Sequence, residues 1–275
     1  MNVLKFIITA LIITSCNAQQ SNNIKNDLDE INTFGKVKSL KGFIYKADES
    51  IDSKKIQVFI KFNEKGYMKE MHWYDDTNQI TAKNFYEYDS VKNVNIMKRY
   101  ESDTILTMKS ITHFNDKGYK LKNIIYRKDG SELKTRLYKY NDIGHEIEME
   151  YIIHYSSKDD YSRWENEYDA NGYLIMAKKF NKDGSFDFKQ TSKNDKDGNE
   201  LEWVRYENDG TVDFRIDKQY DQYGNETKYH MYEGTIDDKE SYKYIYDSKN
   251  NWIEKQHFNN SKKTVVEIRE ITYYE

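Results

Sequence analysis

Aromatic and polar residues alternate along short stretches of this chain. In Tyr86-Glu87-Tyr88 and Tyr138-Lys139-Tyr140, the aromatic side chains fall on one face of an extended strand and a charged residue on the other. Tyr242-Lys243-Tyr244-Ile245-Tyr246 continues the alternation over five residues. Because successive side chains of a strand point to opposite faces, this period of two predicts β-strands with one aromatic face.

A turn motif follows these stretches at a fixed spacing. The motif is aromatic-Asx-x-x-Gly, and its glycines lie 26 residues apart or at multiples of 26, with one step of 28. Complete copies begin at Phe62, Phe114, Tyr140, Tyr168 and Tyr220, copies without the glycine begin at Tyr88 and Tyr246, and a copy without the aromatic begins at Asn194. The Asx side chain accepts backbone N–H groups ahead of it and the glycine supplies a positive φ, so each copy predicts a tight hairpin. A fixed period of this length indicates a repeat architecture.

A second set of turns divides each repeat into two strands. Asp129-Gly130, Asp183-Gly184 and Asp209-Gly210 follow the preceding turn glycine by 12 residues. Eight repeats of about 26 residues, plus leading strands at 37–45 and 56–62, give about eighteen strands. Large open sheets twist and then curl or split. We therefore expect an all-β antiparallel meander that curls into an open shell, an open barrel or a twisted ribbon.

The N-terminus predicts export and lipidation. Lys5 precedes a short apolar run over residues 6–13, which has the layout of a secretory signal and is too short to span a bilayer. The next residues, Ile13-Thr14-Ser15-Cys16, resemble a bacterial lipobox, and Cys16 is the only cysteine of the chain. The resemblance implies that Cys16 is acylated and becomes the mature N-terminus of an outer-membrane lipoprotein. The alternative is an ordinary secretory signal with a cysteine nearby.

These signals divide the chain into three parts. We expect a signal peptide over 1–15, a flexible tether over 16–36 that is rich in Gln, Asn, Ser and Asp, and a β-hairpin repeat domain over 37–275. A helical turn is expected from Asp27 to Ile31.

Composition narrows the class of partner. A mean hydropathy of -1.01 would suggest disorder, but the 25 tyrosines each bring a large apolar area, so the chain can still form a core. Loss of Lys5 with the signal peptide changes the formal net charge from -4 to -5. This mild acidity argues against nucleic-acid binding, which would need a basic surface.

The phrases Tyr220-Asp221-Gln222-Tyr223-Gly224-Asn225 and Tyr246-Asp247-Ser248-Lys249-Asn250-Asn251 resemble the YD repeat of RHS-type proteins. The resemblance extends from about residue 62 to 258 and implies a β-repeat fold in a small bacterial lipoprotein of the Bacteroidetes type. The chain departs from RHS proteins by its longer period, its small size and its lack of a toxin-enclosing cage. Repeat proteins of the MORN type are the nearest rival. Neither resemblance implies a catalytic residue.

Motifs for catalysis or cofactors are not found in the sequence. The six histidines lack zinc-site spacing, and neither a Gly-x-Ser-x-Gly elbow nor a phosphate-binding glycine loop is present. A carboxylate pair of the glycosidase kind is not singled out by spacing. Calcium needs six to eight oxygen ligands, whereas one Asx per turn is explained by turn chemistry. The sequence thus predicts a non-enzyme with no cofactor and no metal.

The step of 28 residues marks the candidate binding loop, because insertions in repeat proteins often map to the binding face. Its residues are Tyr155, Ser156, Lys158, Asp159, Asp160 and Tyr161, followed by Trp164. The leading hypothesis is a lipid-anchored, non-catalytic envelope protein that binds a protein or glycan partner. The alternatives are an immunity partner of a secreted toxin and a carbohydrate-binding module.

Overall fold

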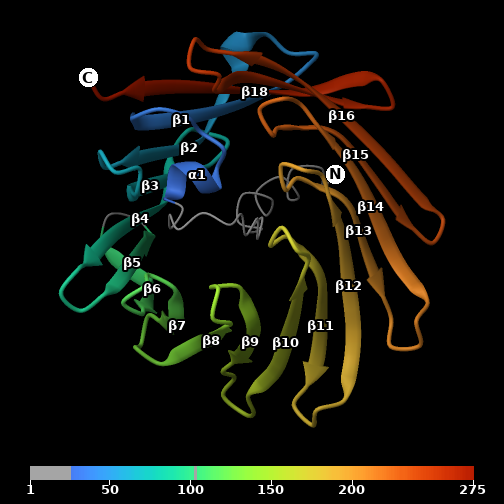
Figure 1. The fold of residues 1–275 in the computed structure, drawn as a ribbon. Helices are drawn as coiled ribbons and strands as arrows, with labels where there is room; N and C mark the ends of the chain where they lie inside the picture. The colour runs from blue at the N-terminus through green and yellow to red at the C-terminus, as the bar shows by residue number, and fades with distance from the viewer. Residues whose placement is uncertain (1–25, 102–103) are drawn as a thin grey trace.

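The sheet of this protein closes on itself. The computed structural model describes residues 26–101 and 104–275, in which 18 antiparallel strands form a ring (Figure 1). Each strand pairs with its neighbours in sequence, and β1 (Val37–Lys46) also pairs with β18 (Lys262–Tyr273). The strands between them are β2 (Lys55–Phe62), β3 (Met68–Tyr74), β4 (Ile80–Asp89), β5 (Val94–Glu101), β6 (Ile105–Phe114), β7 (Lys120–Arg127), β8 (Glu132–Tyr140), β9 (Glu146–Ile153), β10 (Asp160–Tyr168), β11 (Leu174–Asn181), β12 (Phe186–Asn194), β13 (Glu200–Tyr206), β14 (Val212–Tyr220), β15 (Glu226–Glu233), β16 (Ile236–Tyr246) and β17 (Trp252–Asn259).

This closure corrects the predicted open, curled sheet, although the all-β meander itself is confirmed. The register of β1 against β18 runs from Val37 opposite Tyr273 to Lys46 opposite Val265. An open sheet would leave the backbone N–H and C=O groups of both edge strands unpaired, and closure pairs them. Helix is confined to α1 (Asp27–Glu30) and the 3₁₀ turn η2 (Ile51–Ser53) in the described residues, and the short helix α1 confirms the helical turn expected there.

The two sets of turns lie at opposite ends of the barrel, because consecutive strands run in opposite directions. The turns after β2, β4, β6, β8, β10, β12, β14 and β16 contain the Asx motifs and form one end, here called the Asx rim. The remaining turns, including the Asp-Gly turns, form the other end, here called the far rim.

The Asx motif forms the hairpin turn that the sequence predicts. In the turn at 141–144, the Asn141 N–H donates to the His145 carbonyl at 2.9 Å, and the Gly144 N–H donates to the Asn141 carbonyl at 3.0 Å. The Asn141 side-chain oxygen accepts the His145 N–H at 2.8 Å. Gly144 has a φ of 95°, and a bulge follows because Tyr140 pairs with Glu146 while Lys139 pairs with Glu148. In the copy beginning at Tyr246, Asn250 takes the left-handed conformation of the missing glycine.

Side chains of neighbouring repeats satisfy the carbonyls at these bulges. The hydroxyl of Tyr168 donates to the Glu146 carbonyl at 2.8 Å, and that of Tyr220 donates to the Glu200 carbonyl at 3.1 Å. Asn194 replaces the aromatic in its copy, yet its amide donates to the Leu174 carbonyl at 2.9 Å. The apparent exception in the motif therefore keeps the same hydrogen bond.

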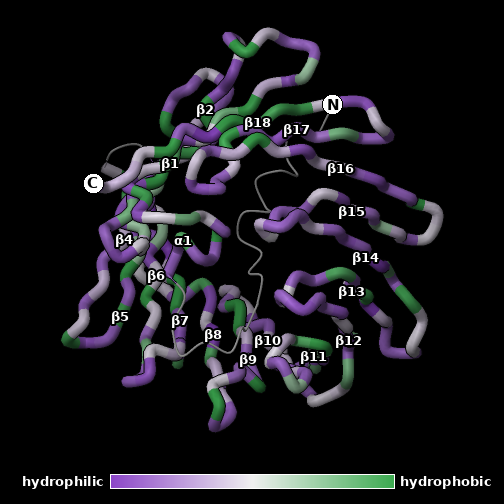
Figure 2. The backbone as a smooth tube through the Cα atoms, turned by 45° about the horizontal axis from the view of Figure 1, so that its top comes forward, coloured by the Kyte–Doolittle hydropathy of each residue, from purple (hydrophilic) through white to green (hydrophobic). Residues whose placement is uncertain are grey.

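The N-terminal segment packs on the barrel, although residues 16–36 were predicted to be a flexible tether. Residues 26–36, here called the N-terminal strap, cross the Asx rim, and Leu28 of α1 packs with Leu40, Ile60 and Phe62. Hydrophobic residues are concentrated along β1, β2 and β18, next to α1 (Figure 2).

Polar contacts hold the strap to distant turns. The Asn32 amide donates to the Tyr223 carbonyl at 2.6 Å. The Phe34 N–H donates to the side-chain oxygen of Asn251, and the side-chain amide of Asn251 donates to the Phe34 carbonyl. Asn251 is only 1% exposed. The predicted tether therefore does not include residues 26–36. The rest of the predicted tether, the predicted signal peptide and Cys16 lie outside the described residues.

Substitutions at two turn glycines can distinguish the cost of backbone strain from the cost of a steric clash. A Cβ on Gly144 would overlap the Tyr119 hydroxyl, whereas a Cβ on Gly130, at a φ of 85°, would meet nothing within 4 Å. Gly130→Ala should lower the free energy of unfolding by about 1–2 kcal/mol, from the left-handed backbone alone. Gly144→Ala should lower it further, because Tyr119 must also move. Urea unfolding of both variants measures the difference, and equal losses would mean that Tyr119 yields without cost.

Candidate functional site

The barrel encloses a lumen, which is the candidate site. Its cavity volume is about 2960 Å³, and its lining is drawn from most strands and from the strap. The part formed by β13 to β18, here called the lumen wall, is the most polar and aromatic. It carries the cationic residues Lys218, Lys255 and Arg269 and the carboxylates Glu200, Asp221, Glu226, Asp238, Glu240 and Glu267. The lumen wall is therefore acidic.

The repeat places these side chains in the lumen by a simple rule. The second residue after the turn glycine, or after Asn250 in its place, lies at the bulge and lines the lumen near the Asx rim. The residues at this position are Met68, Lys120, Glu146, Leu174, Glu200, Glu226 and Trp252. The motif fixes where these side chains point, but their chemistry differs from repeat to repeat.

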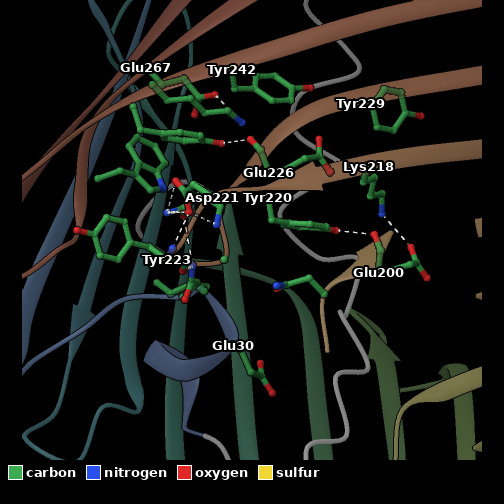
Figure 3. Close-up of a pocket in the computed structure, with 18 of the residues that line it drawn as sticks. Glu30, Glu200, Lys218, Tyr220, Asp221, Tyr223, Glu226, Tyr229, Tyr242 and Glu267 are labelled. Atoms are coloured by element: carbon green, nitrogen blue, oxygen red, sulfur yellow. Dashed lines mark hydrogen bonds and ion pairs between the residues drawn. The ribbon is translucent and has the colours of Figure 1, made fainter. Parts of the chain in front are cut away.

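Glu226 lies at the centre of the lumen wall. Figure 3 shows Glu226 among Tyr220, Tyr229 and Tyr242, which project into the same space. Its backbone carbonyl accepts the Tyr244 hydroxyl at 2.6 Å. Burial raises the pKa of the Glu226 carboxyl, and this effect outweighs the charges of Lys218 and Lys255, which lower that pKa. The carboxylates of Glu240 and Glu200 also raise it. An acceptor group thus faces the cavity beside several aromatic rings.

The tyrosines of the lumen wall stay protonated and act as donors. Burial, with the carboxylates of Glu226 and Asp238, raises the pKa of Tyr229 to about 12. Burial also raises the pKa of Tyr242 above its ordinary value, and the hydroxyl of Tyr242 donates to Glu240. The Lys255 ammonium lies 4.3 Å from the centroid of the Tyr242 ring. Phenol donors, carboxylate acceptors and ring faces therefore coexist on one surface.

Ion pairs fix both sides of the lumen wall. On one side, Glu200 accepts a hydrogen bond from the Lys218 ammonium at 2.9 Å (Figure 3). It also accepts one from the Ser192 hydroxyl at 2.7 Å. On the other side, Glu267 pairs with His257 and lies 3.8 Å from the Lys255 ammonium.

The pKa values of Glu267 and Arg269 are both shifted in the lumen wall, for different reasons. Burial alone would raise the pKa of Glu267, but the hydrogen bond with His257 and the charges of Lys255 and Arg269 outweigh it and lower that pKa to about 2. Burial lowers the pKa of Arg269 to about 10, which leaves the guanidinium charged at neutral pH. This guanidinium stacks on Trp252, 3.5 Å from the ring centroid.

The structure separates the residues of the predicted binding loop. Residues 154–159 join β9 to β10 at the far rim, where Tyr155 is 56% exposed. Lys158, Asp159, Asp160 and Tyr161 line a surface depression of about 440 Å³ together with the β11–β12 turn. Trp164 instead lines the lumen and packs edge-on against Phe188 at 5.4 Å. The loop and Trp164 therefore belong to two different surfaces.

The Asx side chains are occupied by their own turns. Asn63 accepts the N–H groups of Lys65 and Tyr67 at 2.9 and 3.1 Å, and Asp221 accepts those of Tyr223 and Asn225 at 2.8 and 2.9 Å. In residues 26–101 and 104–275, no group of three or more His, Cys, Asp or Glu side chains is placed to hold a metal ion. Neither helix in this part of the chain has the length and apolar character needed to cross a bilayer.

Comparisons with known proteins do not assign a family. No family model matches the chain, and no curated protein matches it significantly. Among solved structures, it is similar to a porin-like protein from Bacteroides uniformis, with 10% identity, a TM-score of 0.42, and coverage of 86% of this chain and 96% of that one.

Two further structures are less similar. The TcdB2–TccC3 complex shows 11% identity and a TM-score of 0.35, and the match covers 80% of this chain but 14% of that one. A putative outer membrane lipoprotein-sorting protein domain from Vibrio parahaemolyticus shows 8% identity and a TM-score of 0.18, over 86% of this chain and 84% of that one. At these values the resemblance to YD-repeat proteins stays a prediction.

Two lumen carboxylates should affect stability with opposite signs. The lowered pKa of Glu267 corresponds to stabilisation that is complete above the ordinary value of 4.5 and is lost as the pH falls towards 2. Glu267→Gln should therefore cost roughly 3 kcal/mol at pH 7, and the cost should shrink below pH 4.5. The raised pKa of Glu226 has the reverse consequence, because its ionised form is disfavoured in the fold.

Glu226→Gln should accordingly raise stability at pH 7 and lose that advantage below pH 4.5. Chemical denaturation of the two variants and the unchanged protein between pH 3 and 8 measures both trends. Parallel stability curves for all three proteins would contradict this assignment of the charges.

Proposed function

We propose that this protein is a lipid-anchored, non-catalytic binding protein of the bacterial cell envelope, which holds a protein or glycan partner in its lumen. The observation that carries the proposal is the lumen wall, where Glu226 and Tyr229 face a cavity of about 2960 Å³. Ligand sites are concave and combine aromatic surface with a few convergent polar groups. The lumen wall has this composition, and the exposed loop at 154–159 offers only a shallow depression.

Of these two kinds of partner, a glycan is favoured on one specific ground. A saccharide presents C–H faces that stack on aromatic rings and hydroxyl groups that both donate and accept hydrogen bonds. The lumen wall supplies Tyr220, Tyr229 and Trp203 as aromatic surface and Glu226 and Lys218 as polar groups. The immunity-partner hypothesis has no comparable observation in its favour.

Lipidation of Cys16 is tested by its replacement. Cys16→Ser should abolish acylation, so the protein should leave the membrane fraction or accumulate unprocessed. Mass spectrometry of the N-terminal peptide and membrane fractionation measure the two effects. Unchanged fractionation together with an N-terminal peptide free of lipid mass would show that the anchor is not at this residue.

Partner capture is tested with variants of the two candidate surfaces. Affinity purification from membranes with Tyr229→Ala or Glu226→Gln should lose the partner, because both side chains face the lumen. Tyr232→Ala is the matched control, since Tyr232 lies on the same strand, is 39% exposed and contacts His230 on the outer surface. It should retain the partner.

Shortening the six connecting residues 154–159 to a four-residue Asp-Gly turn, like the one at 128–131, tests the other surface. This variant should keep both its stability and its partner if the lumen is the binding site. Loss of the partner in this variant alone would move the binding site to the far rim.

A further inference from the structure

The turn tips of the Asx rim include two exposed apolar side chains. Val91 is 94% exposed and Ile143 is 64% exposed, the two highest values among the large hydrophobic residues of the described chain. Tyr88 is 61% exposed, Leu121 45% and Tyr67 40%. Turn tips are normally polar, so branched aliphatic side chains at two of them have no account in the fold itself.

These residues form a contiguous sector of the rim. The turns at 63–66, 89–92, 115–118 and 141–144 are consecutive around the barrel, because β2 to β9 pair in order. The apolar sector is defined here as Tyr67, Tyr88, Val91, Leu121 and Ile143.

The N-terminal chain leaves the folded part at this sector. The Leu28 N–H donates to the carbonyl of Gly66 at 3.2 Å, and the Asn26 side chain covers the same glycine. Asn26 is ten positions after Cys16 in the sequence. Since an extended chain spans at most about 3.3–3.6 Å per residue, Cys16 lies within roughly 35 Å of this turn.

We propose that the apolar sector rests on the lipid bilayer, with Val91 and Ile143 at the boundary between headgroups and acyl chains. This inference rests on the proposed lipid anchor, which would hold the sector at the bilayer surface. Apolar side chains at that boundary are removed from water, and the benefit grows with the buried apolar area.

Charge in the sector is nearly balanced, so the contact is mainly apolar. Exposed lysines alternate with exposed carboxylates at the turn tips and next to them. The lysines are Lys65, Lys69, Lys92, Lys117 and Lys120, and the carboxylates are Glu64, Glu87, Asp116 and Asp142. Electrostatic attraction to anionic lipids therefore contributes little, and neutral lipids serve as well. With the apolar sector on the bilayer, the far rim and its loop at 154–159 face away from the membrane.

The test uses a fluorescent reporter in the lipidated protein. Acylated Cys16 has no free thiol, so a single added cysteine is the only reactive one. Val91→Cys and Ile143→Cys carry an environment-sensitive label on the apolar sector. Val212→Cys and Ile236→Cys are matched controls, because these residues are 57% and 51% exposed at the far rim. Each protein is reconstituted into phosphatidylcholine vesicles, with and without phosphatidylglycerol.

The fluorescence emission of the labels at 91 and 143 should shift to shorter wavelength when the protein is bound to vesicles. Lipids with a doxyl group on the acyl chain should quench this emission. The labels at 212 and 236 should emit as in water, and phosphatidylglycerol should make little difference. Water-like emission at 91 and 143 from protein that floats with the vesicles would overturn the inference and leave the anchor intact. A blue shift at 91 and 143 without lipid quenching would identify a protein contact and would also overturn it. Protein that does not float would instead overturn the lipid anchor.

Discussion

The bulged hairpin at the Asx rim is the constraint on which the rest of the barrel depends. A turn with a left-handed glycine and a bulge rotates the outgoing strand and removes one carbonyl from the regular ladder. A buried carbonyl without a partner would cost about 1–3 kcal/mol. The next repeat supplies the partner, through Tyr168, Asn194, Tyr220 and Tyr244 in four successive cases. Each of these repeats therefore completes the one before it, and the bond from Tyr168 is kept across the step of 28 residues between Gly144 and Gly172.

The same geometry creates the lumen. The residue at the bulge points inward, and in four repeats its carbonyl accepts a hydrogen bond from the neighbouring tyrosine or asparagine. Its side chain is therefore not needed for the turn itself, and this position holds lysine in one repeat, glutamate in others and tryptophan in another. A repeat that keeps its turn chemistry fixed and varies this one position can change the chemistry of the lumen without changing the fold.

The local sequence pattern predicted the strands and both sets of turns, because these depend on residues that are close together in sequence. The positive φ at Gly144 and Gly224 was predictable from the Asx-x-x-Gly motif in the same way, and it is confirmed. Closure of the barrel was not predictable, because the pairing of Val37 with Tyr273 joins the two ends of the chain and leaves no local signal. The docking of the strap is equally non-local, since Asn32 and Phe34 bind turns far along the chain.

The candidate site was predicted least well, and the reason is physical. An insertion draws attention because it breaks the period, whereas Glu226 occupies a regular position in a regular repeat. Two other repeats, at Glu146 and Glu200, have the same charge at this position, and the meaning of the charge depends on which face the position takes. A bulge shifts the alternation of faces by one residue, so the strand pattern alone assigns the side chain to the wrong face. In a barrel of bulged hairpins, the bulge must be placed before the inward residues can be named, and the turn glycine is the residue that places it.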